Sequence, residues 1–215
     1  HPDIVNHAIE KGLCTSPDDF DFRACFEIPN GPQEENGSFH RFGETAKQLH
    51  ERSGAIDEAF FHSLLRMHEG EPDTGDRLFD HKSTTVCMHA DHDGGAETAG
   101  SMVVSYGPLR PTVWISGMSL PCLSVFKPLW FGADMPIYDI DEEDRAIDYW
   151  MKREDMVRGI IEHRVAMEAY ERERSITEKK IFEMVHMVEE TAASEQALAA
   201  LSAQCFALEE EFVDR

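Results

Sequence analysis

The chain has 215 residues and carries 42 acidic against 20 basic side chains, which gives a formal net charge of −22 at pH 7. Nucleic acids and anionic membranes are therefore unfavourable partners, because binding either one requires positive charge that neutralises phosphate groups. The length allows one or two domains, and we expect one domain or the later part of a larger one.

The five cysteines are scattered along the chain and never form a CxxC pair. This pattern favours reduced thiols in a cytoplasmic protein over a disulfide framework or a zinc cluster. No apolar run approaches the roughly 20 residues that a membrane-spanning helix needs. The sequence therefore predicts a cytoplasmic protein that binds neither membrane nor nucleic acid.

A short helix is predicted directly after Pro2 and Asp3, with apolar residues on one face and Gly12 placed to end it. From residue 14 to residue 43 the density of Pro, Asn, Gly and Asp favours irregular structure, interrupted by one helical turn at 21–26.

A helical pair is predicted next, at about residues 44–52 and 57–68. Asp57 is suited to cap the second helix and Gly70 is suited to end it, because these residue types favour the two ends of helices. Residues 69–82 are predicted to form a loop.

Three strands are predicted in the centre of the chain, at residues 84–90, 100–106 and 112–117. In the first strand, the alternation puts Thr85, Cys87 and His89 on one face. The second and third strands are expected to pair antiparallel, because residues 107–111 supply turn residues at hairpin length.

The chain becomes acidic and helical after Tyr138. A first helix is predicted with Asp139 or Asp141 as its cap, and Ser175 with Glu178 gives a capping-box signature for a second helix. The apolar stripe of the second helix runs from residue 181 to residue 212. We divide the chain into residues 1–138 and an acidic helical pair at 139–215, which packs on the same domain or on a partner.

Several ordered motifs together resemble a known family. They are a Cys-Met-His segment at 87–89, a Gly-Ser-Met-Val segment at 100–103, a Leu-Leu-Arg segment at 64–66 and the segment Pro-Cys-Leu-Ser-Val-Phe-Lys-Pro at 121–128. In these features the chain resembles the C69 (formerly U34) dipeptidases and their relatives, the secernins. The resemblance covers most of residues 1–132 and fades in the C-terminal helices.

The resemblance implies an α+β fold that is part of an N-terminal nucleophile hydrolase-like αββα sandwich. In such enzymes an N-terminal cysteine attacks the amide carbonyl, its own α-amino group serves as the base, and an acyl-enzyme forms before water releases it. His1 cannot fill that role. We therefore expect the nucleophilic cysteine upstream of this chain, no catalytic residue within it, and no activity from the 215 residues alone.

The resemblance further implies that the complete protein is a cytoplasmic cysteine dipeptidase with small peptide substrates. The expected partners are the missing N-terminal part of the same protein and further copies in a homo-oligomer. The alternative is a secernin-like, non-enzymatic interaction protein, and a third hypothesis is that the long acidic helices serve mainly to oligomerise.

Five side chains are candidate substrate-binding residues: Cys87, His89, Cys122, Ser124 and Lys127. The resemblance implies that Cys87 and His89 line the substrate pocket, although a thiolate–imidazole dyad is an alternative. Cys122 and Ser124 could present donors to a substrate carboxylate or amide, or could form a buried structural turn. Lys127 is the candidate charge partner for a substrate carboxylate.

The most metal-like pattern is the run from His89 to Asp93, since imidazole and carboxylate groups suit divalent metals. It continues into a glycine loop, and no second set of ligands follows at a recognisable spacing. We therefore predict no metal site and no cofactor.

Overall fold

The computed structural model describes residues 3–26, 37–68, 85–90, 96–135, 138 and 140–214. The chain divides into two compact units, residues 1–39 and residues 40–215. Helices and a three-stranded antiparallel sheet are both present, which confirms the α+β class. The division predicted at residue 138 stays a prediction.

The first unit is small and helical. It contains α1 (Ile4–Glu10), the 3-10 helix η1 (Pro17–Asp19) and α2 (Phe22–Phe26), so the short helix and the later helical turn are confirmed. Gly12 follows α1 with a φ of 69°, a backbone conformation that glycine adopts readily. The buried residues that hold this unit together are Ala8, Cys14 and Cys25.

The predicted helical pair corresponds to α3 (Gly37–Glu51) and α4 (Glu58–Leu65). α3 begins earlier than predicted. The Asp57 cap of α4 is confirmed, because its carboxylate accepts a 2.8 Å hydrogen bond from the Phe60 amide. α4 ends at Leu65 rather than near Gly70, which lies outside the described residues.

The sheet consists of β1 (Met102–Tyr106), β2 (Pro111–Ile115) and β3 (Lys127–Leu129), in that spatial order. β1 and β2 form the predicted hairpin, in which Val104 pairs with Val113. β3 pairs antiparallel with β2, with Trp114 opposite Pro128. The third strand is thus supplied by a segment for which the sequence predicted none.

The strand predicted at residues 84–90 is wrong for its described part, because residues 85–90 form no strand. Thr85, Cys87 and His89 are buried while the residues between them are half-buried, so the alternation in the sequence did report alternating burial. The segment is instead held by two single backbone bonds, from the Cys87 amide to Met67 (3.1 Å) and from the Thr98 amide to Met88 (3.1 Å). Alternating burial alone therefore does not make a strand.

The C-terminal part forms α5 (Glu143–Ile161), α6 (Met167–Glu189) and α7 (Glu195–Val213), with a 3-10 turn, η4 (Ile140–Glu142), before α5. The prediction of a helical pair is corrected, because the long stripe from 181 to 212 belongs to two helices. Ser194 caps α7 by accepting a 3.2 Å hydrogen bond from the Ala197 amide. A polar cap in the middle of an apolar stripe was the signal for this break.

Two predicted caps in this region are also wrong. Glu142, rather than Asp139 or Asp141, is the N-cap residue of α5. Ser175 lies inside α6, and the side chain of Glu178 is turned into the protein, where it is paired with Arg66 and Arg174. The Ser-x-x-Glu spacing at residues 175–178 is therefore not a capping box, because Glu178 takes part in a buried ion pair instead.

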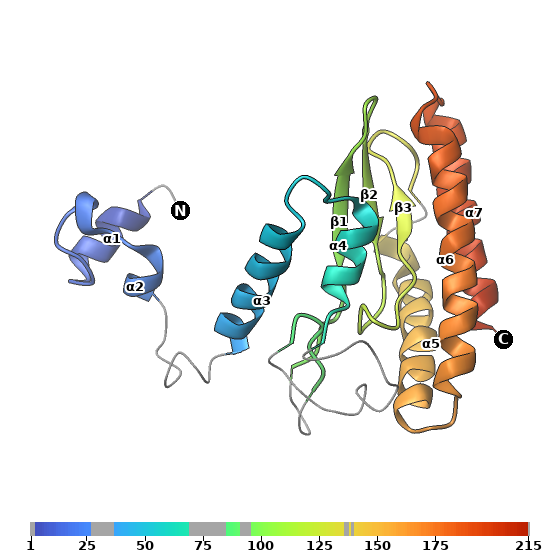
Figure 1. Cartoon of the computed structure of the whole chain (residues 1–215), viewed down its shortest axis with the longest axis horizontal. Coiled ribbons are helices and arrows are strands. Elements are labelled where there is room, and N and C mark those ends of the chain that lie inside the picture. The colour runs from blue at the N-terminus through green and yellow to red at the C-terminus, as the bar shows by residue number, and fades with distance from the viewer. Residues whose placement is uncertain are drawn as a thin grey trace. The chain divides into compact units, whose positions relative to one another are not determined.

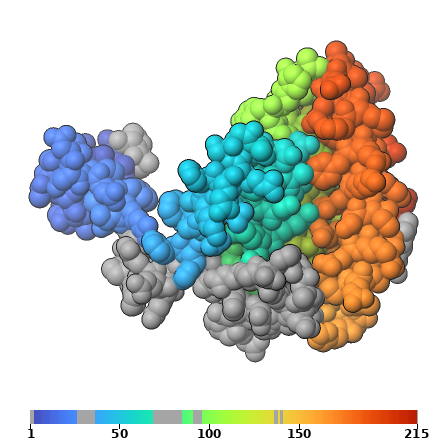
Figure 2. Space-filling view, in the orientation of Figure 1, coloured from blue at the N-terminus to red at the C-terminus, as the bar shows by residue number. Residues whose placement is uncertain are grey.

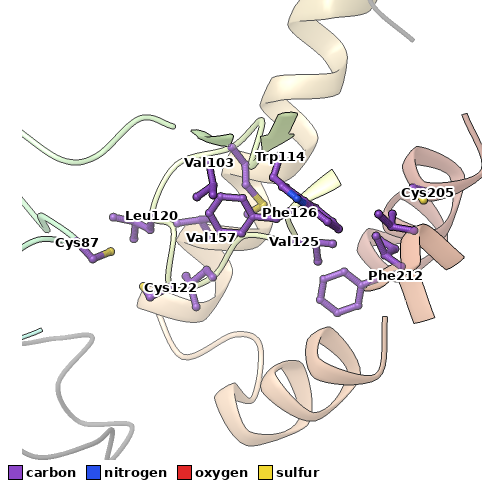
Figure 3. Packing of buried hydrophobic residues seen from close by; sticks show 14 of the residues in the cluster. Cys87, Val103, Trp114, Leu120, Cys122, Val125, Phe126, Val157, Cys205 and Phe212 are labelled. Atoms are coloured by element: carbon purple, nitrogen blue, oxygen red, sulfur yellow. The ribbon is translucent and has the colours of Figure 1, made fainter. Parts of the chain in front are cut away.

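The elements of the second unit pack around a single apolar core. α4 lies against β1, α7 lies against β3, and α6 and α7 run side by side (Figure 1). In the space-filling view the C-terminal helices form one continuous side of this unit (Figure 2). Trp114 and Phe126 lie in the core between Cys87 and Cys122 at one end and Cys205 and Phe212 at the other (Figure 3).

Candidate functional site

Four side chains of metal-binding and nucleophilic type meet at one end of the core of the second unit. The His89 Nε2 atom lies 3.6 Å from Cys87 Sγ, 3.5 Å from Cys122 Sγ and 3.1 Å from His68 Nε2. One atom from each of the four residues lies within 4.8 Å of all the others. Figure 3 shows the two cysteines at this end of the core.

The backbone near α4 sets the positions of His68, Cys87 and His89. The Met67 carbonyl accepts a hydrogen bond from the Cys87 amide, which places His68 beside the Cys-Met-His segment. The Thr85 hydroxyl donates a 2.6 Å hydrogen bond to the Cys87 carbonyl, and the Met88 amide donates a 3.0 Å bond to the Thr98 hydroxyl. These bonds fix the segment without a strand ladder.

Cys122 sits on a tight turn between β2 and β3. Leu120, directly before Pro121, has a φ of 56°, in the left-handed region that costs a bulky residue about 1–2 kcal/mol. The turn is closed by a 2.8 Å bond from the Leu123 amide to the Leu120 carbonyl, and the Leu120 amide reaches Thr98 at 2.8 Å. Strain of this kind persists where the surrounding structure fixes the backbone.

Arg66 fixes the backbone of this turn by hydrogen bonds to its carbonyl groups. Its guanidinium donates to the Pro121 carbonyl at 3.0 Å and to the Ser124 carbonyl at 2.8 Å, on both sides of Cys122. It also forms an ion pair with Glu178 of α6. Arg66 therefore ties the end of α4 and the Cys122 turn to α6.

Three of the four side chains are buried, and the Cys87 thiol is polarised by its neighbours. Cys87 is fully buried, and His89 and Cys122 are only 4% and 6% exposed. A hydrogen bond with Cys122 is the main cause that lowers the pKa of Cys87 well below its ordinary value, and hydrogen bonds with His68 and His89 act in the same direction. Burial opposes this shift but does not cancel it.

The polar groups of Ser124 and Lys127 have hydrogen-bond partners within the fold. The Ser124 hydroxyl donates back to the Leu120 carbonyl at 3.1 Å. The Lys127 ammonium is fully buried and donates to the carbonyls of Ser116 (2.6 Å) and Val125 (3.1 Å) and to Glu209. An ammonium has three donors, so these contacts leave none for a substrate carboxylate and argue against the predicted role.

The structure thus brings together three of the five candidate residues, Cys87, His89 and Cys122. His68 was not found from the sequence, because it lies outside every motif and is brought near the site by the hydrogen bond from the Cys87 amide to the Met67 carbonyl. Of the metal-like run 89–93, residues 91–93 lie outside the described residues.

Comparisons with known proteins assign no family to this chain. No family model matches it, and no solved structure matches it. The likeness to the C69 dipeptidases and secernins therefore remains a prediction from the motifs.

A membrane-spanning helix must be both long and apolar, and the helices of the described segments can be judged on both properties. None of them is both long enough and apolar enough to cross a lipid bilayer.

Three kinds of chemistry are open to two thiols and two imidazoles at these distances. A thiolate–imidazole dyad needs its nucleophile within reach of a substrate, whereas the Cys87 side chain is fully buried. A disulfide would engage Cys87 and Cys122 and leave both histidines without a role. Coordination of one metal ion uses all four groups.

Proposed function

We propose that this chain is a portion of a C69-type dipeptidase, a cysteine N-terminal nucleophile hydrolase that cleaves dipeptides or related small amides. One observation carries the proposal. The Cys-Met-His and Pro-Cys motifs, on which the resemblance depends, lie more than 30 residues apart in sequence, yet their side chains meet in one cluster. Motifs that converge in space are expected of residues that build one site.

The fold is compatible with this proposal. In an αββα sandwich the antiparallel sheet of this chain would supply one sheet edge, and α5, α6 and α7 would supply part of an outer helical layer. The exclusively antiparallel pairing of β1, β2 and β3 agrees with the sheets of that architecture.

The proposal gives the described residues a supporting role. The attacking thiol is proposed to be an N-terminal cysteine outside the 215 residues, and the buried cluster around His89 supports the wall of the site from within. Cys87 cannot replace that nucleophile, because a side chain that is fully buried offers no path to a dipeptide.

The test compares two proteins in a dipeptide hydrolysis assay: the 215-residue chain and the protein isolated from its native source. We expect hydrolysis only by the native protein, inhibition by thiol alkylation, and cysteine as its N-terminal residue. Hydrolysis by the 215-residue chain would contradict the position of the nucleophile. An inert native protein without an N-terminal cysteine would reject the dipeptidase.

The secernin-like alternative, an interaction protein without activity, is favoured by apolar side chains exposed on the C-terminal helices. Met151 on α5 and Met187 on α6 are 57% and 69% exposed. The same side chains support the expected homo-oligomer. Light scattering tests that part, because a chain that stays monomeric at high concentration would exclude self-association.

A further inference from the structure

We propose that His68, Cys87, His89 and Cys122 form a tetrahedral site that binds one structural zinc ion. The inference goes beyond the dipeptidase proposal and does not depend on it, since it rests only on the placement of four side chains in the 215-residue chain. It also replaces the prediction that the chain has no metal site.

The three separations from His89 Nε2 fit a single zinc ion, and the remaining pairs lie within 4.8 Å of one another. Zinc binds thiolate sulfur at about 2.3 Å and imidazole nitrogen at about 2.0–2.1 Å, so the edges of a tetrahedron are about 3.3 Å between two nitrogens and about 3.5 Å between sulfur and nitrogen. The three corresponding separations around His89 Nε2 are 3.1 Å to His68, 3.5 Å to Cys122 and 3.6 Å to Cys87. All three agree within about 0.2 Å with the tetrahedral edges.

The chemistry of the four groups selects zinc. Two thiolates and two imidazoles form the Cys2His2 set of structural zinc sites, and hard cations such as calcium and magnesium prefer oxygen ligands instead. Two thiolates also balance the double charge of the ion. Because three of the four ligands are buried, a neutral complex avoids the cost of burying unpaired charge.

The ligands come from three separate stretches of chain. His68 follows α4, Cys87 and His89 belong to segment 85–90, and Cys122 lies on the strained turn between β2 and β3. With four protein ligands a zinc ion keeps no open position for water or substrate, which is the mark of a structural site. The ion would fasten segment 85–90, which has no strand partner, to both neighbours.

A second group of metal-binding type provides a useful contrast. Glu58, His186 and Glu189 lie close together, but His186 is exposed and the group has two carboxylates and no thiol. Exposed groups of this kind occur commonly without a metal. It therefore serves as a control for weak surface binding.

The first experiment measures zinc in the 215-residue chain, purified under reducing conditions without a metal-binding tag and passed over a gel-filtration column. We expect one zinc ion per chain by elemental analysis. X-ray absorption should show two sulfur neighbours at about 2.3 Å and two nitrogen neighbours at about 2.0–2.1 Å. Cobalt substitution should give the absorption bands of a tetrahedral site with thiolate ligands.

The second experiment compares matched variants. Cys122→Ala and His68→Ala should each weaken zinc binding at least about tenfold, because one ligand of the tetrahedron is lost. Cys205→Ala, which removes a buried cysteine elsewhere in the core, and His50→Ala, which removes an exposed histidine of α3, should retain one zinc ion. His186→Ala should likewise have no effect.

The outcomes separate the proposal from its alternatives. A folded, fully reduced wild-type chain that retains no zinc would overturn it, and so would a zinc spectrum without sulfur neighbours. A native disulfide between Cys87 and Cys122, detected by mass spectrometry, would also overturn it. If Cys122→Ala fails to fold, the wild-type spectrum and the half-buried His68 still decide the question. None of these measurements involves peptide hydrolysis.

Discussion

A buried group of charges beneath the sheet gives the sharpest prediction about stability. Glu209 of α7 accepts hydrogen bonds from Lys127 of β3, from Arg153 of α5 at 2.6 and 3.0 Å, and from the Tyr149 hydroxyl at 2.8 Å. Glu209, Lys127 and Arg153 are all completely buried. One carboxylate therefore compensates two cations that have no access to solvent.

Glu209→Gln should remove that compensation while nearly preserving the volume of the side chain. Removing one partner of a buried ion pair costs about 3–5 kcal/mol, because the remaining charge is left without solvent or counter-charge. Whole domains have a free energy of unfolding of only about 5–15 kcal/mol. With a urea dependence of about 2 kcal/mol per molar, the unfolding midpoint should fall by about 1.5–2.5 M.

Urea unfolding followed by tryptophan fluorescence measures this loss in the right part of the molecule. All three tryptophans, Trp114, Trp130 and Trp150, belong to the second unit, so the signal is free of the first one. Glu210→Gln is the matched control. It removes a neighbouring carboxylate that is exposed and has only a 3.8 Å contact with Lys152, and such changes usually alter stability by less than about 0.5 kcal/mol.

Two results would refute this reasoning. One is a Glu209→Gln midpoint equal to that of Glu210→Gln. The other concerns the double variant Lys127→Met, Glu209→Gln, which removes one of the two orphaned cations. Its loss of stability should be smaller than the sum of the two single losses, because the two residues interact directly. A strictly additive pair would show that the ion pair contributes little.

Three further changes test other parts of the second unit. Burial, with the Arg66 charge nearby, lowers the pKa of His62 to about 3, so the folded protein should lose stability as the pH falls below about 6.5, where only the unfolded chain binds the proton. His62→Phe should remove this pH dependence. In urea titrations the difference in free energy of unfolding between variant and wild type should change by about 2–3 kcal/mol between pH 7 and about pH 4.5. A difference that does not change with pH would contradict a neutral buried imidazole. Arg66→Lys should cost at least about 1.5 kcal/mol by the same measurement, since an ammonium cannot reach both carbonyls and the carboxylate, whereas Arg52→Lys on the surface should be neutral. Gly132→Ala should lower the thermal midpoint, because Gly132 has a φ of 86° and an added Cβ would lie 2.9 Å from the Glu195 carboxylate, while Gly100→Ala, with only a 3.9 Å neighbour, should not.

Local patterns predicted the elements that depend on local chemistry. The Asp57 cap and the β1–β2 hairpin with its glycine and proline turn follow from neighbouring residues, and both are present. The start of α3 differed from the prediction because no strong capping signal marks it, and α4 ends at Leu65, before the glycine that was expected to end it. Local sequence signals therefore predicted where helices and strands occur better than they predicted the residues at which these begin and end.

The errors arose where distant partners decide the structure. The 84–90 segment has the alternation of a strand, but strands also need a neighbour with free backbone groups, and only single bonds reach this one. Glu178 resembled a capping residue, yet one of its two ion-pair partners is Arg66, more than 100 residues away. A single sequence does not show which distant residue will contact a given side chain in the folded protein.

In the candidate site, too, residues within local motifs were found from the sequence and those placed by distant contacts were not. Cys87, His89 and Cys122 were singled out from the motifs as candidates to line a substrate pocket, and His89 also as the first residue of a metal-like run. His68 could not be found, because its spacing to Cys87 matches no metal motif and its place depends on a long-range backbone bond. The sequence could not show that Lys127 has a buried counter-charge, because Glu209 lies on α7, 82 residues further along the chain.

The position of Glu209 also has a consequence during synthesis. The ribosome releases β3 and α5 well before α7, so a nascent chain holds Lys127 and Arg153 without the carboxylate that neutralises both. Until α7 emerges, the two cations must stay in water, and the underside of β3 cannot close. The second unit should therefore complete its fold only after α7 has left the ribosome, and chains stalled before α7 should be open to proteases and chaperones.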